Sequence, residues 1–119
     1  MSKVTAEFYE TDDGKQPARD FLLSLDKKLR AKMLMLIDVL QENGNELREP
    51  YSKHLDDGIF ELRGQQGGQI SRVLYFFCVG QMVILTNGFV KKTQKAPPNE
   101  IEKAKQYRAD YLRRRGDAQ

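Results

Sequence analysis

Three β-rich runs of sequence, joined by two short glycine-containing connections, constrain this chain more than any other feature. The runs cover Ile59 to Arg63, Ile70 to Val79 and Met82 to Val90, and the connections are residues 64–68 and 80–81. Connections of this length join neighbouring antiparallel strands. The third run is apolar at nearly every position, which is typical of a strand buried on both faces. The sequence therefore predicts a three-stranded antiparallel meander.

An amphipathic helix is predicted before the meander. Its apolar residues repeat at helical spacing: Leu29, Met33, Leu36, Ile37 and Leu40. Asp26 is expected to cap the N-terminus of this helix, and Asn43-Gly44 to end it, because these residues tolerate left-handed geometry. A shorter helix is expected from Pro17 to about Ser24, since proline suits the first helical turn.

The remaining segments complete an α+β order. Val4 to Tyr9 alternates as a first strand, and the polar segment Asn45 to Gly58 is expected to be a loop. Pro97-Pro98 precedes a final helix, for which Asn99 and Glu102 are the expected cap pair. The predicted fold is α+β in the order β-α-α-β-β-β-α. It has an antiparallel sheet with the two N-terminal helices on one face, an open opposite face and a C-terminal helix.

Length and composition indicate one domain spanning residues 1–119. Apolar residues make up 39% and charged residues 31%, as in soluble globular proteins. No apolar run approaches the ~20 residues that cross a bilayer, and the N-terminus lacks an apolar signal region. We therefore expect a cytoplasmic protein without a membrane partner. Cys78 is the only cysteine and lies in an apolar run, so we expect a buried structural thiol.

Charge is distributed unevenly along the chain. Residues 1–61 carry nine Lys/Arg against thirteen Asp/Glu, and residues 100–119 carry six against four. Between these segments there is no acidic residue, and the bases are Arg63, Arg72, Lys91, Lys92 and Lys95. A cationic stretch without carboxylates suits a surface that binds a polyanion, because each base near a phosphate displaces a condensed counterion.

Period-two alternation predicts which strand residues share a face of the sheet. When the apolar residues of the first run face the helices, Glu61 and Arg63 point to the opposite face. Arg72 points the same way when its apolar neighbours face the helices, and Phe89 and Lys91 share a face. We therefore expect the cations to converge on one side of the sheet.

Most of the known arrangements of catalytic residues are missing from the sequence. It has no glycine-rich phosphate loop, no histidine-rich metal spacing and no serine nucleophile signature, so no metal or other cofactor is expected. Asp12-Asp13 and Asp56-Asp57 lie in turn-forming contexts, where capping is their expected role. His54, the only histidine, is either a solvated or structural residue or a proton shuttle. The remaining Arg, Lys and Tyr residues suit cleavage of RNA by its own 2′-hydroxyl, because Arg binds phosphate permanently and Lys becomes a base when neighbouring cations lower its pKa.

Four segments carry a recognisable pattern of motifs: Pro50 to Leu55, Gly58 to Arg63, Arg72 to Phe76 and Gly88 to Pro97. Together they resemble the successive motifs of phage-derived, HigB-type toxins in the RelE/ParE superfamily, over nearly the whole chain. The resemblance implies a RelE-like fold and the toxin role in a type II toxin-antitoxin system. It also implies a cognate antitoxin that binds the protein in a hetero-oligomer, and cleavage of mRNA on the ribosome that inhibits translation.

The resemblance and the chemistry together assign roles to individual residues. Arg63 and Arg72 are expected to bind phosphate and stabilise the transition state, and Lys91 to act as general base. Substrate binding is assigned to Lys92, Lys95, Lys53, His54 and Phe89. Candidates for the leaving-group acid are Tyr75, Tyr107 and Tyr111. Replacing Arg72 or Lys91 by alanine is expected to abolish activity with folding nearly intact. The alternative functions are a non-catalytic ParE-like inhibitor of DNA gyrase and a plain nucleic-acid-binding module.

Overall fold

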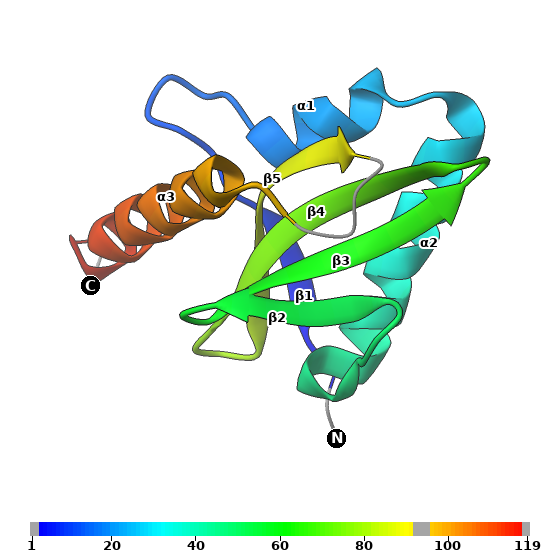
Figure 1. Cartoon of the computed structure of the whole chain (residues 1–119). Helices are drawn as coiled ribbons and strands as arrows, with labels where there is room; N and C mark the ends of the chain where they lie inside the picture. The colour runs from blue at the N-terminus through cyan, green and yellow to red at the C-terminus, as the bar shows by residue number, and fades with distance from the viewer. Residues whose placement is uncertain (1–2, 92–95, 118–119) are drawn as a thin grey trace.

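The elements of the computed structural model follow the predicted order, with one additional strand (Figure 1). The structure describes residues 3–91 and 96–117. Its helices and strands are β1 (Thr5–Phe8), α1 (Pro17–Ser24), α2 (Lys27–Asn43), a short 3-10 helix (Gly44–Glu46), β2 (Ser52–Asp56), β3 (Ile59–Gln66), β4 (Gln69–Cys78), β5 (Met82–Lys91) and α3 (Pro98–Asp117).

One five-stranded sheet, in the order β1-β5-β4-β3-β2, runs through the molecule. The predicted meander is confirmed, because β3, β4 and β5 pair antiparallel in chain order. β1 joins the other side of β5 in parallel, with Thr5 opposite Met82, so the sheet is mixed rather than wholly antiparallel. β5 therefore lies inside the sheet, with a strand on each side.

The prediction that residues 45–58 form a loop is wrong. After the 3-10 helix this segment forms β2, which pairs antiparallel with β3 at the edge of the sheet. Ser52 is buried and its hydroxyl is hydrogen-bonded to the Tyr75 hydroxyl, whereas Lys53 and His54 are exposed. Such a half-exposed edge strand lacks the apolar run that identifies a buried strand from sequence.

The helices α1 and α2 cover one face of the sheet, as predicted. All five residues of the predicted apolar stripe of α2 are buried: Leu29, Met33, Leu36, Ile37 and Leu40. They form a core with apolar strand residues such as Leu62 and Val73. Asp26 caps α2 by accepting a hydrogen bond from Leu29 N (2.9 Å), and Gly44 at φ 56° ends the helix, so both predicted boundaries are confirmed.

Two glycines allow these helices to approach the strands closely. A Cβ atom at Gly88 of β5 would overlap the Phe21 ring of α1. A Cβ atom at Gly64 of β3 would lie 2.5 Å from the sulfur of Met33 in α2. The spacing between the helices and the sheet therefore depends on having glycine, which has no side chain, at these two positions.

The helix α3 covers part of the opposite face, which the sequence predicted to be open (Figure 1). Ala104 of α3 is fully buried and shares a second core with Leu74, Phe76 and Ile84 of the sheet. The sheet is therefore packed on both faces, with α1 and α2 on one side and α3 on the other. Within the described residues, no helix is both long and apolar enough to cross a membrane.

The start of α3 differs from the predicted cap. The helix begins at Pro98, and Ile101 N donates a hydrogen bond to Pro97 O. Asn99 therefore lies inside the first turn, and the expected pair of Asn99 and Glu102 is not the cap. Proline is favoured at the first helical position because the N–H that it lacks would have no partner within the helix.

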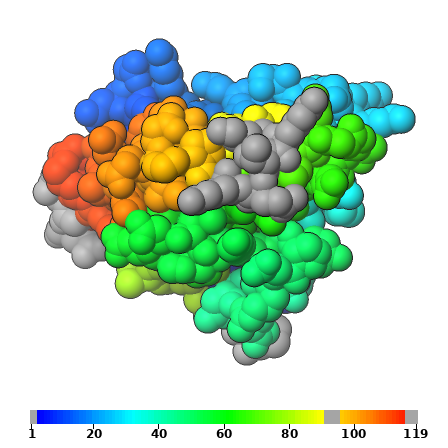
Figure 2. Space-filling model, viewed as in Figure 1, coloured from blue at the N-terminus to red at the C-terminus, as the bar shows by residue number. Residues whose placement is uncertain are grey.

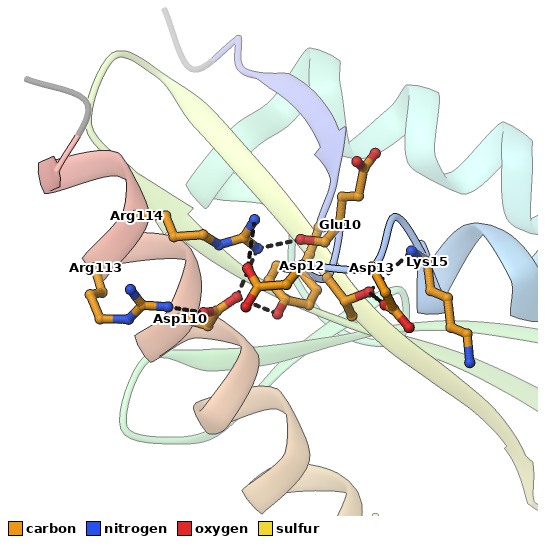
Figure 3. A network of polar contacts seen from close by, with 9 residues as sticks. Glu10, Asp12, Asp13, Lys15, Asp110, Arg113 and Arg114 are labelled. Atoms are coloured by element: carbon orange, nitrogen blue, oxygen red, sulfur yellow. Dashed lines mark hydrogen bonds and ion pairs between the residues drawn. The ribbon is translucent and has the colours of Figure 1, made fainter.

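A charged network ties the C-terminal half of α3 to the loop after β1 (Figure 3). Asp110 at its centre accepts hydrogen bonds from the Tyr9 hydroxyl (2.6 Å) and from Arg113 (2.6 Å), and pairs with Arg114 at 2.7 Å. Arg114 also donates to the backbone carbonyl of Glu10. Burial, together with the hydrogen bond to Asp110, raises the pKa of Tyr9 to about 12. The first strand and the last helix are thus held to one another by polar contacts as well as by packing.

Candidate functional site

Three charged side chains meet on the α3 side of β3 and β4. Arg63 and Arg72 are opposite each other on the two strands, and Glu61 precedes Arg63 by one period on the same face. The Nε atom of Arg72 lies 3.3 Å from Glu61 Oε1, and the Nε atom of Arg63 lies 3.4 Å from Glu61 Oε2. One carboxylate therefore bridges two guanidiniums. We call these three residues the Arg-Glu-Arg cluster.

The members of the Arg-Glu-Arg cluster differ in exposure. The exposed fraction of the side chain is 0% for Arg72, 1% for Glu61 and 15% for Arg63. Burial raises the pKa of the Glu61 carboxyl above its usual range, against the opposing effects of Arg72 and Arg63. Burial also lowers the pKa of the Arg72 guanidinium, and Glu61 opposes that shift. Arg63 is thus the arginine of the cluster that reaches solvent, and Arg72 lies beneath the surface.

Phe89 extends this arrangement to a third strand. It is opposite Arg72 in the register of β4 and β5, and the guanidinium carbon of Arg72 lies 5.7 Å from the centre of the Phe89 ring. This is a cation–π contact, so one face of the ring packs on Arg72. Lys91 ends β5 opposite Ile70, one strand period beyond Phe89. The other predicted binding residues near it, Lys92 and Lys95, lie outside the described residues.

The two predicted binding residues of β2 lie on opposite faces of the sheet. Lys53 is opposite Glu61, so it shares the face of the Arg-Glu-Arg cluster. His54 is opposite Phe60, and the two rings pack edge to face with centres 5.1 Å apart. The Nε2 atom of His54 accepts a hydrogen bond from Gly58 N (3.1 Å). The structure therefore brings Lys53 to the cluster and directs His54 to the other side of the sheet.

The three tyrosines considered as acids are engaged elsewhere. Tyr75 is buried on the α1 and α2 side, and this burial raises its pKa to about 12. Tyr107 stacks on Tyr9 with ring centres 4.7 Å apart. Tyr111 donates a hydrogen bond from its hydroxyl to Glu7 (3.1 Å). Each of the three tyrosine side chains therefore has a packing or hydrogen-bond partner outside the Arg-Glu-Arg cluster.

Glu61 is the site residue that sequence reasoning missed. It directly precedes the acid-free stretch, so that stretch was expected to form a site without a carboxylate. Alternation along β3 puts Glu61 on the same face as Arg63, and this alternation is the signal that identifies it. When Glu61 is ionised, the two arginines and one carboxylate carry one net positive charge. The expectation of an acid-free cationic cluster is therefore wrong for these residues.

One of the predicted acid pairs links two elements of the fold. Asp56 pairs with Lys105 at 2.6 Å and Asp57 with Arg108 at 3.0 Å, which ties the turn between β2 and β3 to α3. Figure 2 shows β2 (green) and α3 (orange) against each other on this side of the molecule. Across residues 3–91 and 96–117, no three His, Cys, Asp or Glu side chains form a group that could hold a metal ion.

The Arg-Glu-Arg cluster is suited to orienting an arginine toward an anion. A guanidinium has five N–H donors in a planar fork, more than one carboxylate oxygen can use. Glu61 lies 3.3 Å and 3.4 Å from the Nε atoms of Arg72 and Arg63, so its charge attracts both guanidiniums. The solvent-reaching position of Arg63 then gives this side of the sheet a positioned cation for a phosphate or a carboxylate.

Comparison with known proteins identifies the family. No curated protein matches the sequence significantly. A family model described as "Phage derived protein Gp49-like (DUF891)" matches residues 20–109. The matched region contains α2, the strands β2 to β5 and the whole Arg-Glu-Arg cluster. Since this region is well over half of the chain, the protein belongs to the phage-derived Gp49-like family, a RelE/toxin-like family.

Proposed function

We propose that this protein is the toxin of a type II toxin-antitoxin system and an endoribonuclease that cuts mRNA on the ribosome in the cytoplasm. Membership of a RelE/toxin-like family supports the toxin class. The observation that carries the enzymatic part is the row formed by Arg63, Arg72 and Phe89 on three neighbouring strands, around the carboxylate of Glu61. The guanidinium of Arg63 reaches solvent and suits the phosphate of a nucleotide, and the partly exposed ring of Phe89 suits its base.

In the proposed reaction the 2′-hydroxyl of the RNA loses its proton to a base and its oxygen bonds to the adjacent phosphorus. The bond from phosphorus to the 5′-oxygen of the next nucleotide breaks, and that oxygen takes up a proton and leaves as a hydroxyl group. The protein then has to orient the RNA, move two protons and stabilise the charge that develops on the phosphorus. Arg63 makes the phosphate contact, because its side chain reaches solvent. Arg72 is buried and supports this contact by holding Glu61, which in turn holds Arg63. Lys91, at the end of β5, is the proposed general base. The proposed mechanism needs no metal ion.

The proposed partner is an antitoxin that binds the protein in a hetero-oligomer. Its binding segment is expected to be acidic, amphipathic or both, because the chain has a net charge of +3 and the face of Arg63 also carries Lys53. Co-expression of the neighbouring open reading frame should relieve the growth arrest caused by the protein. Failure of every neighbouring gene to relieve it would contradict the toxin-antitoxin proposal.

Primer extension on a cellular mRNA after a short pulse of expression tests the enzymatic proposal. Wild-type protein should produce cuts at defined positions within codons, and Arg63→Ala should reduce cleavage by about 10²-fold or more. Lys15→Ala removes a cation from the exposed loop after β1 and serves as the matched control, with cleavage unchanged. Intact mRNA accompanied by a DNA-damage response would contradict the ribonuclease and favour the inhibitor of DNA gyrase.

A further inference from the structure

A hollow beside Arg63 forms just before the start of β2, where the edge of β3 faces α2. Its volume is about 300 Å³. Residues of α2, β3, β4 and the segment before β2 line it, among them Lys32, Leu36, Tyr51, Arg63, Gln65 and Ile70. Pockets for small ligands have volumes of about 300–1,000 Å³, so this hollow fits one small ligand.

The lining of this hollow combines an apolar floor with positive charge. Leu36 and Ile70 are buried beneath it, and Lys32 and Arg63 both border it. No carboxylate occurs among the described residues that line it. In contrast, the hollow beside the C-terminal half of α3 has two arginines and two glutamates in its lining. The lining next to Arg63 therefore fits an anion that also has an apolar surface.

Tyr51 provides an exposed aromatic residue in the lining of the hollow. The residue is 50% exposed. Its backbone carbonyl accepts a hydrogen bond from Arg63 N (2.8 Å), and its own N–H donates to Arg48 O (3.1 Å). The backbone contact with β3 thus places Tyr51 opposite Arg63, and both residues line the hollow. Exposed aromatic rings of this kind are stacking surfaces for the bases of single-stranded RNA.

Gln65 provides a hydrogen-bond donor at the same place. In an antiparallel sheet the N–H groups of alternate residues point to the same side of the strand. The N–H of Arg63 points toward the β2 side, where it meets Tyr51, so the N–H of Gln65 points to that side as well. Among the described strands, the pairing of β2 with β3 ends at Ser52 opposite Leu62. The backbone N–H of Gln65 is therefore directed past the first residue of β2, where the edge of a base can accept from it.

We infer that this hollow binds the nucleotide next to the phosphate held by Arg63. The base stacks on Tyr51 and accepts a hydrogen bond from Gln65, and Lys32 neutralises the adjoining phosphate. The inference rests on the proposed ribonuclease function and deepens it, because it names single-stranded RNA as the ligand and gives Tyr51 and Gln65 a part in binding it.

Kinetics on ribosomes programmed with mRNA test this assignment. Tyr51→Ala should lower kcat/KM by about 5- to 150-fold, the range expected for one lost base stack, with a smaller effect on kcat. Tyr51→Phe keeps the ring and should retain the wild-type kcat/KM. Lys32→Gln should also lower kcat/KM, whereas Lys27→Gln makes the same charge change on α2 outside the hollow and should leave it unchanged. Equal kcat/KM for Tyr51→Ala and wild type would overturn the inference.

A binding measurement separates this inference from the proposed function. A 2′-O-methylated trinucleotide cannot be cleaved, and in an NMR titration it should shift the backbone amide signals of Tyr51 and Gln65 in the wild type and much less in Tyr51→Ala. If the trinucleotide shifts these signals but the protein cuts no mRNA, the ribonuclease is rejected and the nucleotide site stands. If mRNA is cut and these signals do not shift, the nucleotide site is rejected. Loss of antitoxin binding in Tyr51→Ala, with RNA binding and cleavage unchanged, would assign the hollow to the protein partner and overturn the inference.

Discussion

Replacing Arg72 by alanine is expected to destabilise the fold by about 3–5 kcal/mol at pH 7. The Arg72 side chain is fully buried, with its Nε atom 3.3 Å from Glu61 and its guanidinium over the ring of Phe89. Its removal leaves the buried Glu61 with Arg63 as its remaining partner within the cluster. Removing one partner of a buried ion pair lowers the free energy of unfolding by about 3–5 kcal/mol. A domain has a total stability of about 5–15 kcal/mol, so this is a large share. The expectation that Arg72→Ala leaves folding nearly intact therefore does not agree with the burial of Arg72.

The cost of Arg72→Ala should also depend on pH. Burial raises the pKa of Glu61 in the folded protein above its ordinary value of 4.5. The contribution of this carboxyl group to the free energy of unfolding is therefore fully present below pH 4.5 and is lost as the pH rises through its pKa in the folded protein. Removing Arg72 raises that pKa further, so the deficit relative to wild type should increase from pH 4.5 to pH 7.

Urea unfolding followed by far-UV circular dichroism at the two pH values measures this deficit. The double variant Glu61→Gln with Arg72→Met removes both charges at similar volume and should recover much of the loss. A cost below about 1 kcal/mol at pH 7, or a deficit that is the same at both pH values, would refute the reasoning.

Three further predictions concern other parts of the molecule. In a spectrophotometric titration, Tyr9 and Tyr75 should ionise near pH 12, later than an ordinary tyrosine, and ionisation of all five tyrosines near pH 10 would contradict their burial. Gly88→Ala should lower the free energy of unfolding in urea by roughly 1–3 kcal/mol, because the new methyl group overlaps Phe21. The loss should be smaller when Phe21 is also replaced by leucine, and an equal loss with and without Phe21→Leu would show that this contact is not the cause. Cleavage of mRNA should persist with a chelator selective for transition metals, because Arg63 and Lys91 carry the proposed chemistry, and recovery of activity only on adding such a metal would contradict it.

The parts of the fold that the sequence predicted correctly are those with a strong periodic pattern. The stripe from Leu29 to Leu40 repeats at helical spacing because one side of α2 is buried, and the structure buries those residues. The meander was predictable because short glycine-containing turns restrict the pairing of the strands they connect. The choice of face for Arg63 and Arg72 followed from alternation alone.

The features that the sequence did not predict depend on contacts between distant segments. β2 has a polar sequence because one of its faces is exposed, so its strand character comes from pairing with β3. The parallel position of β1 beside β5 leaves no local signal in either strand. Alternation placed Glu61 and Arg72 on the same face, but their burial together depends on what covers that face. For the same reason, the sequence alone does not show that His54 lies on the face opposite the cluster, since this depends on the register of β2 with β3.

The parallel pairing of β1 with β5 has a consequence for how the protein is made. β1 is synthesised before its partner, because the segment of β5 around Met82 follows it by more than 70 residues. At about 5–20 residues per second, the intervening chain takes roughly 4–15 s to make. Until then β1 has no neighbour in the sheet, and Phe89 cannot pack on Arg72. The sheet and the row of site residues on it are therefore completed only after β5 has been synthesised, so a nascent chain that ends before β5 carries neither.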